Sequence, residues 1–459
     1  MTELSYAAAI RALQERGRFG IRLGLGRTRA LLRELGNPER TIRGALIAGT
    51  NGKGSVLTLA AAALRKAGYR TATTPKPHLV TYRERLQIDG RPIDPATFAR
   101  LVGKVLPIAD RVARRHGEPT EFELLTAVLF RWFADEGVDL AVVEVGLGGR
   151  LDATHAWDGG VAVVTNVALD HMAQLGPTVR HIAREKAAII ERGDLAVTGA
   201  DGEALAIVRR RAQRMGVPLA VVRAPAVVDL GREGIVIELP RLGPTRVGLL
   251  GRHQAANVAV ADATLDALEA AGIATVPREA RQDGYAAARW PGRLELLTID
   301  GRDVLLDGAH NPAGAASLAD ALDDLRPFLR GGGSHDGGAG DVPRAGVAAM
   351  TLVVGVMADK DVEGIVAALA RSVALRGARI ICTRVDSERA LPADRLAAVW
   401  EAIGGERTII VEPSVPTAVD RALSTAAGPI VVAGSLYLVG AARALLVDDP
   451  ILRDPPHDR

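Results

Sequence analysis

A glycine-rich loop between an apolar strand and a helix constrains this chain more than any other feature of its sequence. The loop follows the apolar run 45–48, precedes the apolar run 56–64, and comprises Gly49, Thr50, Asn51, Gly52, Lys53, Gly54 and Ser55. Glycines let backbone N–H groups approach a polyphosphate, and the N-terminus of the following helix adds partial positive charge. In such a loop the lysine neutralises the outer phosphates and the serine hydroxyl can hold Mg²⁺. The pattern predicts an ATP site of a shortened form, because two residues separate Gly49 from Gly52.

The length of 459 residues exceeds what one hydrophobic core usually organises, so two domains, or three, are expected. No apolar run approaches the roughly twenty residues of a membrane span. The N-terminus carries no basic segment followed by an apolar one. A single cysteine, Cys382, excludes an internal disulfide. These features predict a cytoplasmic protein without a membrane partner.

The charge pattern argues against nucleic-acid binding. The net charge is +3, aromatic residues make up 3% of the chain, and charges of both signs are mixed along it, whereas a nucleic-acid site needs a basic patch with interleaved aromatics. Positive charge comes mostly from arginine, and the lysines that fall inside motif segments are Lys53, Lys76, Lys186 and Lys360. Such a lysine indicates a need for a compact ammonium or a reactive amine. The alternative is that these four lysines fall inside motif segments by chance.

Apolar runs alternate with helical stretches between about residues 45 and 222, which predicts a doubly wound, mostly parallel sheet. The expected buried strands are 140–143, 161–164, 195–197 and 219–222. Glu144 closes one of them and Asn166 follows another, so polar groups lie at the carboxyl ends, where such sheets bind ligands. Apolar and polar residues alternate from 234 to 250, which predicts antiparallel strands appended to this domain.

A second, smaller α/β domain is expected after the break at 290–292, where the sequence reads Trp-Pro-Gly. Its expected strands are 304–306, 351–354, 378–382 and 430–432. The predicted domains are therefore 1–292 and 293–459. Residues 331–345 are rich in glycine and are predicted to form a flexible surface loop.

The glycine-rich loop resembles the ATP-binding loop of the Mur ligase superfamily, and its form is similar to that of the folylpolyglutamate synthase and dihydrofolate synthase branch. Further segments match in the family's order along nearly the whole chain: 77–79 with 84–85, 120–123, 144–154, 169–171, 185–187, 253–257, 307–312 and 434–440. The resemblance implies a Mur ligase-like ATPase domain that binds ATP and folate at 1–292. It also implies a Rossmann-like glutamate ligase domain at 293–459.

Amide formation from a carboxylate and an amine requires activation, which ATP provides by making an acyl phosphate. Such chemistry needs Mg²⁺ and cations that neutralise the transferred phosphoryl group. Glu144 and His171 follow two parallel strands at the edge that carries Lys53 and Ser55. The resemblance implies that Glu144 and His171 bind magnesium with Ser55. By residue type alone, His171 is more often a hydrogen-bonded histidine at a helix end than a magnesium ligand.

The resemblance implies further roles. Lys186 is expected to be carbamylated, the alternative being an ordinary surface lysine, and K⁺ is considered as a second cation. The expected nucleotide contacts are Asn257 and Asp307 on adenine and ribose, and Arg293 and His310 on the phosphate side. Asp307 with Gly308 also has the form of a turn. The expected substrate contacts are Lys76, His78, Arg85 and Asp152.

Two of the positions that depart from the family pattern bear on the site. Lys76 stands where the family usually has a serine near magnesium, and His155 stands where asparagine is usual. An ammonium cannot ligate a metal cation, so that ligand is missing or replaced by water. Lys76 either takes over part of the metal's work on the phosphate, pairs with a carboxylate of glutamate, or turns to solvent.

The resulting expectation is an ATP-dependent amide ligase that joins L-glutamate to folate or dihydropteroate, releasing ADP and phosphate. The resemblance implies a monomer, and leaves open whether both synthase activities are present. The alternatives are a Mur-type ligase that acts on another carboxylate acceptor, and a nucleotide-binding homologue with impaired catalysis.

Overall fold

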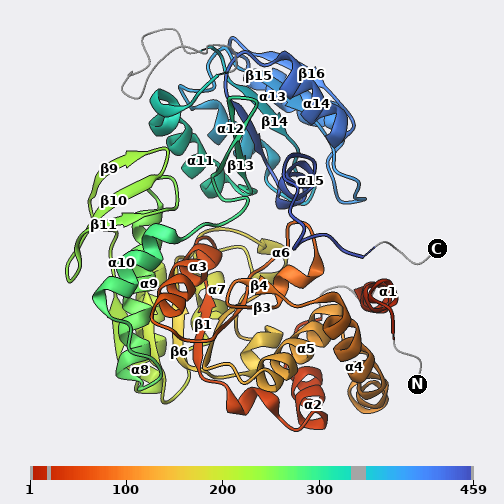
Figure 1. Cartoon of the computed structure of the whole chain (residues 1–459), viewed down its shortest axis with the longest axis vertical. Coiled ribbons are helices and arrows are strands. Elements are labelled where there is room, and N and C mark those ends of the chain that lie inside the picture. Colours follow the sequence, from red (N-terminus) through yellow and green to blue (C-terminus); the bar gives the residue numbers. More distant parts are fainter. Residues whose placement is uncertain (1–3, 18–21, 332–347, 456–459) are drawn as a thin grey trace. The chain divides into compact units, whose positions relative to one another are not determined.

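The computed structural model describes residues 4–17, 22–331 and 348–455 (Figure 1). These residues fall into two compact units. The first comprises Met1–Pro225, Ala256–Tyr285 and Pro450–Arg459, and the second comprises Ala226–Ala255 and Ala286–Asp449. Of the predicted glycine-rich loop 331–345, only residue 331 lies within the described part.

The described part of the first unit is built on an eight-stranded sheet in the order β4-β3-β2-β5-β1-β6-β7-β8. Strands β2, β5, β1, β6, β7 and β8 run parallel, while β3 and β4 form an antiparallel edge. The strands are β1 (Gly44–Ala48), β2 (Thr71–Thr74), β3 (Gln87–Ile88), β4 (Arg91–Pro92), β5 (Leu140–Glu144), β6 (Gly160–Val164), β7 (Leu195–Thr198) and β8 (Leu219–Val221).

The central strands explain where a ligand can bind. Every residue of β1 and β5 is buried, as expected for parallel strands that helices cover on both faces. The chain leaves β1 for β2 on one side and later adds β6 on the other, so the carboxyl ends of β1, β5 and β6 meet at one edge of the sheet. The predicted doubly wound sheet and its four expected strands are confirmed, but the prediction that all four are buried is wrong for β8, which lies at the edge of the sheet and is partly exposed.

Helices cover this sheet and extend it. Helix α3 packs on β1, β2 and β5, while α1, α2, α4 and α5 pack together as a group coloured red to orange (Figure 1). Helix α5 begins with a capping box, because the Thr120 hydroxyl and the Glu123 carboxylate bind each other's backbone N–H. The helices are α1 (Tyr6–Gly17), α2 (Gly26–Glu34), α3 (Lys53–Lys66), α4 (Pro95–His116), α5 (Glu121–Asp135), α6 (Met172–Leu175), α7 (Val179–Ala187), α8 (Gly202–Met215), α9 (Gln254–Ala270) and α10 (Arg278–Ala287). Short 3₁₀ turns are η1 (Pro38–Thr41), η2 (Tyr82–Arg85) and η3 (Ala153–Ala156).

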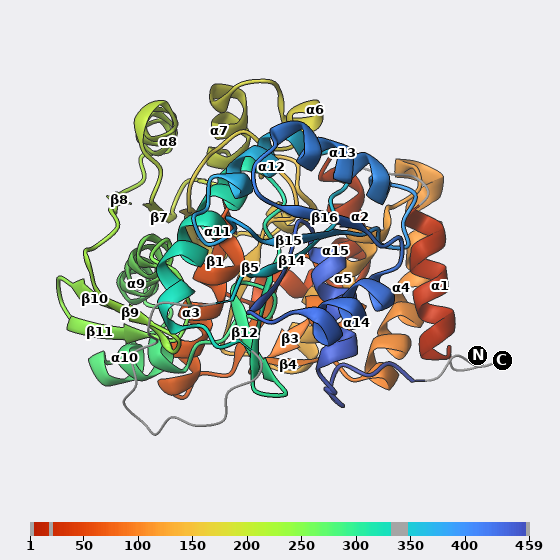
Figure 2. The same ribbon diagram turned by 90° about the horizontal axis from the view of Figure 1, so that it is seen from above.

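The second unit has its own six-stranded sheet within the described residues, in the order β12-β13-β17-β14-β15-β16. Only β12 in this sheet is antiparallel to its neighbour. Helices α11, α12 and α13 cover one face, and α14 and α15 cover the other (Figure 2). The elements are β12 (Glu295–Ile299), β13 (Arg302–Asp307), α11 (Pro312–Leu325), η4 (Arg326–Phe328), β14 (Thr351–Val354), α12 (Val362–Ala370), β15 (Arg379–Cys382), α13 (Ala393–Ile403), β16 (Thr408–Val411), α14 (Val415–Thr425), β17 (Ile430–Ala433) and α15 (Leu436–Leu446). The predicted second α/β fold is confirmed.

A three-stranded antiparallel ribbon belongs to the second unit, whereas the sequence pattern predicts its strands as part of the first domain. It consists of β9 (Val227–Gly231), β10 (Gly234–Leu239) and β11 (Gly243–Val247). One contact that ties the ribbon to this unit is an ion pair, in which Nη2 of the partly exposed Arg232 lies 2.9 Å from Oδ1 of the fully buried Asp303 on β13. The boundary after residue 292, and the function given to each domain, stay predictions.

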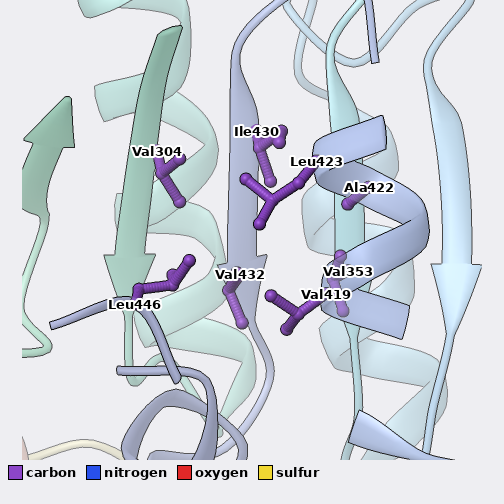
Figure 3. A pocket seen from close by; sticks show the side chains of 8 residues that line it. All are labelled: Val304, Val353, Val419, Ala422, Leu423, Ile430, Val432 and Leu446. Carbon is purple, nitrogen blue, oxygen red and sulfur yellow. The ribbon is translucent and has the colours of Figure 1, made fainter. Parts of the chain in front are cut away.

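A narrow apolar crevice with no room for a water molecule lies between α14 and α15 and the sheet of the second unit (Figure 3). Its lining is entirely aliphatic: Val304, Val353, Val419, Ala422, Leu423, Ile430, Val432 and Leu446. Ligand sites in proteins usually combine apolar walls with a few polar groups that fix orientation. This crevice has none, so we interpret it as core packing. In the described parts of both units, no helix combines the length and the apolarity needed to cross a bilayer.

Candidate active site

The loop after β1 adopts a conformation that only glycine permits at two positions. A Cβ added to Gly49 would lie 1.8 Å from Thr165 Oγ1, and a Cβ added to Gly52 would lie 2.2 Å from Asn257 Oδ1. Gly52 also has a φ of 81°, a left-handed conformation in which it caps helix α3. Asn257, on α9, therefore lies against this loop, and its expected contact with the nucleotide stays a prediction.

The segment after β6 holds the loop in place. Asn166 accepts the N–H of Thr50 with its carbonyl at 3.0 Å and the N–H of Asn51 with its side chain at 2.9 Å. The Thr50 hydroxyl donates to the Ala168 carbonyl at 3.1 Å, and Thr165 donates to the Asn51 carbonyl at 2.7 Å. The first N–H groups of helix α3 have no acceptor within the helix. A fixed loop therefore presents them for an anion.

Two lysines meet at the same loop carbonyl. Lys53 Nζ donates to the carbonyls of Gly49 and Thr50, both at 3.1 Å, and Lys186 Nζ donates to Gly49 at 2.8 Å. Burial, together with the charge of Lys53, lowers the pKa of Lys186 to about 7. Lys186 is only 5% exposed, so the alternative of an ordinary surface lysine is wrong.

Lys76 points inward and binds Glu144 at two places. Its backbone N–H donates to Glu144 Oε2 at 3.0 Å, and its Nζ donates to the Glu144 carbonyl at 2.6 Å. The ammonium also lies 4.6 Å from the ring centroid of Phe122. Burial lowers the pKa of Lys76 to about 8, although the carboxylates of Asp152 and Glu144 oppose that shift. The alternative of a solvated Lys76 is therefore wrong.

The predicted magnesium ligands lie on three elements of the first unit. Glu144 is the last residue of β5, 3% exposed, with Oε1 3.9 Å from Lys53 Nζ, and Ser55 lies buried in the first turn of α3. His171 is the N-cap residue of α6, with a φ of 49°, and its side chain does not cap the helix by a hydrogen bond. Among the described residues no three His, Cys, Asp or Glu side chains form a metal cluster. A carboxylate and a hydroxyl suit Mg²⁺, which prefers oxygen and keeps positions for phosphate and water.

A second cluster forms on and around η2. Arg85 Nε donates to His78 Nδ1 at 2.9 Å, and the His78 and Tyr82 rings pack against each other at a tilt of 38° with centroids 4.5 Å apart. Arg85 also lies 3.8 Å from a Glu121 carboxylate oxygen. Because a guanidinium only donates, Nδ1 of His78 must accept, so the neutral ring carries its proton on Nε2. Burial and the charge of Arg85 accordingly lower the pKa of His78 to about 3. We call His78, Tyr82, Arg85 and Glu121 the η2 cluster.

Asp152 and His155 organise the loop after β5. Asp152 accepts the N–H of Leu147 at 2.8 Å and the N–H of Thr154 at 3.0 Å. His155 Nδ1 lies 3.1 Å from the Arg150 carbonyl, and its Nε2 lies 3.2 Å from Glu191. The structure thus gives Asp152 a structural role, and its role as a substrate contact stays a prediction.

The remaining predicted nucleotide contacts belong to the second unit. The Asp307 carboxylate accepts the N–H groups of Leu294 and Ala309, each at 2.9 Å, and its burial raises its pKa. Arg293 Nη1 donates to the Gly292 carbonyl at 3.2 Å, and His310 Nδ1 lies 2.8 Å from the Gly308 carbonyl. The turn at Asp307 is confirmed, and the contacts of Arg293, Asp307 and His310 with nucleotide stay predictions.

Sequence reasoning missed the residues that hold the segment 78–85. The Glu84 carboxylate accepts three backbone N–H groups, from Leu79 at 3.0 Å and from Val80 and Thr81 at 2.7 Å. Thr81 and Glu84 have the spacing of a capping box, which is a signal visible in the sequence. The partners of Phe122 and Thr165 lie far away along the chain and leave no such signal.

Comparisons with known proteins agree along nearly the whole chain. Residues 47–265 match the family model of the Mur ligase middle domain, and residues 294–445 match that of the dihydrofolate synthetase C-terminal domain. The chain is 36% identical to the dihydrofolate synthase/folylpolyglutamate synthase of Mycobacterium tuberculosis over 471 residues, which covers 93% of this chain and 90% of that protein.

Two solved structures are similar over both units. The folylpolyglutamate synthase of Mycobacterium tuberculosis complexed with ADP and AMPPCP has a TM-score of 0.82 and 33% identity, and covers 96% of this chain and 100% of its own. A bifunctional folylpolyglutamate synthase/dihydrofolate synthase with Mn, AMPPNP and L-glutamate bound has a TM-score of 0.77 and 28% identity, and covers 96% and 98%.

Proposed function

This chain belongs to the folylpolyglutamate synthase and dihydrofolate synthase family and is an ATP-dependent ligase that adds L-glutamate to a folate, and we propose that the reaction is carried out around the loop Gly49 to Ser55. The observation that carries this proposal is the gathering of Lys53, Lys186 and Asn257 at that loop. The enzyme uses ATP and a divalent metal ion.

The first step activates the acceptor. A carboxylate oxygen of the folate attacks the γ-phosphorus of ATP, an O–P bond forms, and the bond to the β-phosphate oxygen breaks so that ADP leaves. Charge spreads over the γ-phosphoryl oxygens in that transition state. The N–H groups that open α3, together with the ammonium groups of Lys53 and Lys76, would stabilise this charge. Both lysines already lie beside Glu144, so the positive charge is in place before the reaction.

Ser55, Glu144 and His171 would hold Mg²⁺. The ion, when bound, supplies positive charge to the phosphate oxygens. The fit rests on the buried Glu144 carboxylate and on its position beside the loop. Lys53 and Lys76 already lie close to Glu144, so its charge is partly balanced without the metal. K⁺ stays a proposed second cation.

Lys186 is proposed to be carbamylated. Its buried amine has a pKa of about 7, so a large fraction is neutral near that pH and carries the lone pair that attacks CO₂. The attack forms an N–C bond and releases one proton, which turns an amine into a carbamate anion. That anion would balance the positive charge of Lys53, which lies at the same carbonyl.

The η2 cluster is the proposed site for the acceptor. Arg85 offers a permanent positive charge for a carboxylate, and neutral His78 offers its Nε2–H as a hydrogen-bond donor. In the second step the neutral glutamate amine attacks the acyl carbon, the new C–N bond forms, and the nitrogen loses a proton to solvent, while the acyl C–O bond breaks and phosphate leaves with the oxygen that the acceptor carboxylate supplied. Lys76, near Phe122 and Glu144, is the proposed cation between the acceptor and the phosphates.

Several finer statements belong to this proposal. We propose a monomer in the cytoplasm, which uses Mg²⁺ and takes folate, dihydropteroate or both as acceptor. The support is the family resemblance and, for the described residues, the lack of a membrane-spanning helix.

A panel of acceptor acids with a phosphate-release readout tests the proposal. We expect release that requires L-glutamate together with folate or dihydropteroate, and that is lost in Lys53→Ala. Release that requires a cell-wall precursor instead would favour a Mur-type ligase with another acceptor. A folded protein that binds ATP without any acceptor-dependent release would be an impaired homologue.

A further inference from the structure

A buried arginine ties the C-terminal segment of the chain to η2 within the first unit. Arg83 is 3% exposed, and its Nε donates to Asp454 Oδ1 at 3.1 Å. Its Nη2 donates to the carbonyls of Ile451 and Arg453, both at 2.9 Å, and its Nη1 donates to the Ile93 carbonyl at 3.2 Å. Three of these four acceptors come from the segment 450–455.

The same carboxylate reaches a second residue of the turn. The Thr81 hydroxyl donates to Asp454 Oδ1 at 2.6 Å and also lies 3.1 Å from the hydroxyl of Tyr6 on α1. Thr81 is the N-cap of η2 and accepts the N–H of Arg83. Asp454 is therefore joined to both the cap and the first turn of η2.

This turn also carries the proposed acceptor site. Tyr82 and Arg85 lie on η2, and Arg85 binds His78 at the start of the same segment. Arg83 lies between Tyr82 and Arg85 in the chain, so a shift of Arg83 moves the backbone that holds both. The Glu84 carboxylate links η2 to the N–H groups of Leu79 and Val80, which extends any such shift towards His78.

Loss of the segment 450–455 would remove most of the hydrogen-bond acceptors of Arg83. A guanidinium that is out of water needs acceptors for its N–H groups, and a buried charge that loses its partner is strongly destabilising. Without residues 450–455, Arg83 would keep only the Ile93 carbonyl among the four acceptors described above. The turn would then move until water reached the guanidinium.

We propose that residues 450–455 are a positioning element of the acceptor site, and that Asp454 acts through Arg83 and Thr81 to fix the η2 cluster. This inference rests on the proposed function, because it takes the η2 cluster as the place where the folate acceptor binds. It predicts that the segment governs the affinity for the acceptor while the phosphate loop keeps its affinity for ATP.

The test compares two truncations of the full chain. One protein ends at Asp449 and loses every contact with Arg83 and Thr81 that the segment makes, and the matched control ends at Pro455 and keeps them. We expect the shorter protein to have a KM for the folate acceptor raised about fivefold or more, with the KM for ATP changed by less than about twofold. An unchanged acceptor KM in the folded shorter protein would overturn the proposal, as would an equal rise in both KM values.

A single substitution covers the case in which the shorter protein does not fold. Asp454 has a side chain 35% exposed, so Asp454→Asn keeps the shape and removes the charge at the surface end of the pair. We expect Asp454→Asn to raise the acceptor KM, and Asp454→Glu to restore part of the affinity. Identical acceptor KM values for wild type and both variants would overturn the role of Asp454.

Arg85→Ala separates this inference from the proposed function. If Arg85→Ala raises the acceptor KM and Asp454→Asn does not, the acceptor site stands and the positioning role fails. If neither variant changes the acceptor KM, the η2 cluster is not the acceptor site, and the inference fails with it. Direct titration of dihydropteroate into each protein in the presence of ADP gives the same comparison without turnover.

Discussion

Lys76 and Glu144 are joined at both ends of the lysine, because the Lys76 backbone N–H binds the Glu144 carboxylate and the Lys76 ammonium binds the Glu144 carbonyl. The ammonium is therefore held beside the residue expected to bind the metal. Burying a cation carries a free-energy penalty, and an anion that binds beside the cation reduces that penalty. We therefore expect the pair to favour the binding of phosphate at this edge of the sheet.

Lys76→Met tests whether that ammonium acts in the reaction. The substitution keeps a long side chain near Phe122 and removes the charge, so we expect a loss of about tenfold or more in kcat/KM, equivalent to about 1.4 kcal/mol of transition-state stabilisation. Steady-state kinetics measures the loss. Lys104→Met, at an exposed position of α4, is the matched control. Unchanged kinetics in Lys76→Met would show Lys76 to be a bystander.

Local patterns predicted the parts of the site that adjacent residues build. The loop 49–55, the strand ending at Glu144 and the strand before Asn166 each follow from a short run of sequence, because buried parallel strands are continuous apolar runs. Contacts between residues that lie far apart in the sequence could not be predicted from such local patterns. Arg83 and Asp454 are 371 positions apart, and nothing near either residue signals the other. The inward position of Lys76 likewise depends on Phe122 and Glu144, which only the folded sheet brings near it.

Glu144→Gln should lower kcat by a factor of about a hundred or more, because the amide cannot supply the charge that holds a divalent ion beside the phosphates. The substitution keeps the size of the side chain and can still accept the N–H of Lys76. Activity measured against magnesium concentration should show a higher requirement for the metal. Glu233→Gln, at an exposed position of the second unit, is the control. A normal magnesium dependence in Glu144→Gln would exclude a role in metal binding.

Carbamylation of Lys186 should depend on pH and on CO₂. Since burial lowers the pKa of Lys186 to about 7, the amine is mostly protonated at about pH 6 and mostly neutral at about pH 8, and only the neutral form reacts. Protein equilibrated with ¹³C-bicarbonate at the higher pH should give a carbamate signal in ¹³C NMR spectra that Lys186→Arg lacks. Activity of CO₂-depleted protein should recover on adding bicarbonate. A wild-type spectrum identical to that of Lys186→Arg would contradict the modification.

Asp194 should make the folded state less stable as the pH rises. Burial, with the nearby carboxylates of Asp158 and Glu191, raises its pKa to about 7 from an ordinary value of 3.8. Between these two pKa values the folded protein holds a proton that the unfolded chain has released. The free energy of unfolding therefore falls as the pH rises from the unfolded to the folded pKa. Asp194→Asn can still accept the Glu191 N–H and should stabilise the fold by about 1 kcal/mol at pH 8.

Thermal unfolding of wild type and Asp194→Asn at several pH values checks this prediction. The gain in Tm should shrink as the pH falls through about 7 and should be absent near pH 4, where the wild-type carboxyl is protonated. Asp201→Asn, at an exposed position, is the control for a change of net charge. A gain in Tm that does not vary with pH would contradict the assigned cause.

The most direct test of the central claim, that ATP activates the acceptor as an acyl phosphate in this enzyme, follows one oxygen atom. Dihydropteroate or folate labelled with ¹⁸O in its reacting carboxylate is incubated with ATP, L-glutamate and the protein, and the released phosphate is analysed by mass spectrometry. Because the carboxylate oxygen attacks the γ-phosphorus and later leaves with it, we predict one ¹⁸O atom in each phosphate, with no phosphate formed by Lys53→Ala. Phosphate released without ¹⁸O, while the glutamylated product accumulates, would contradict the account.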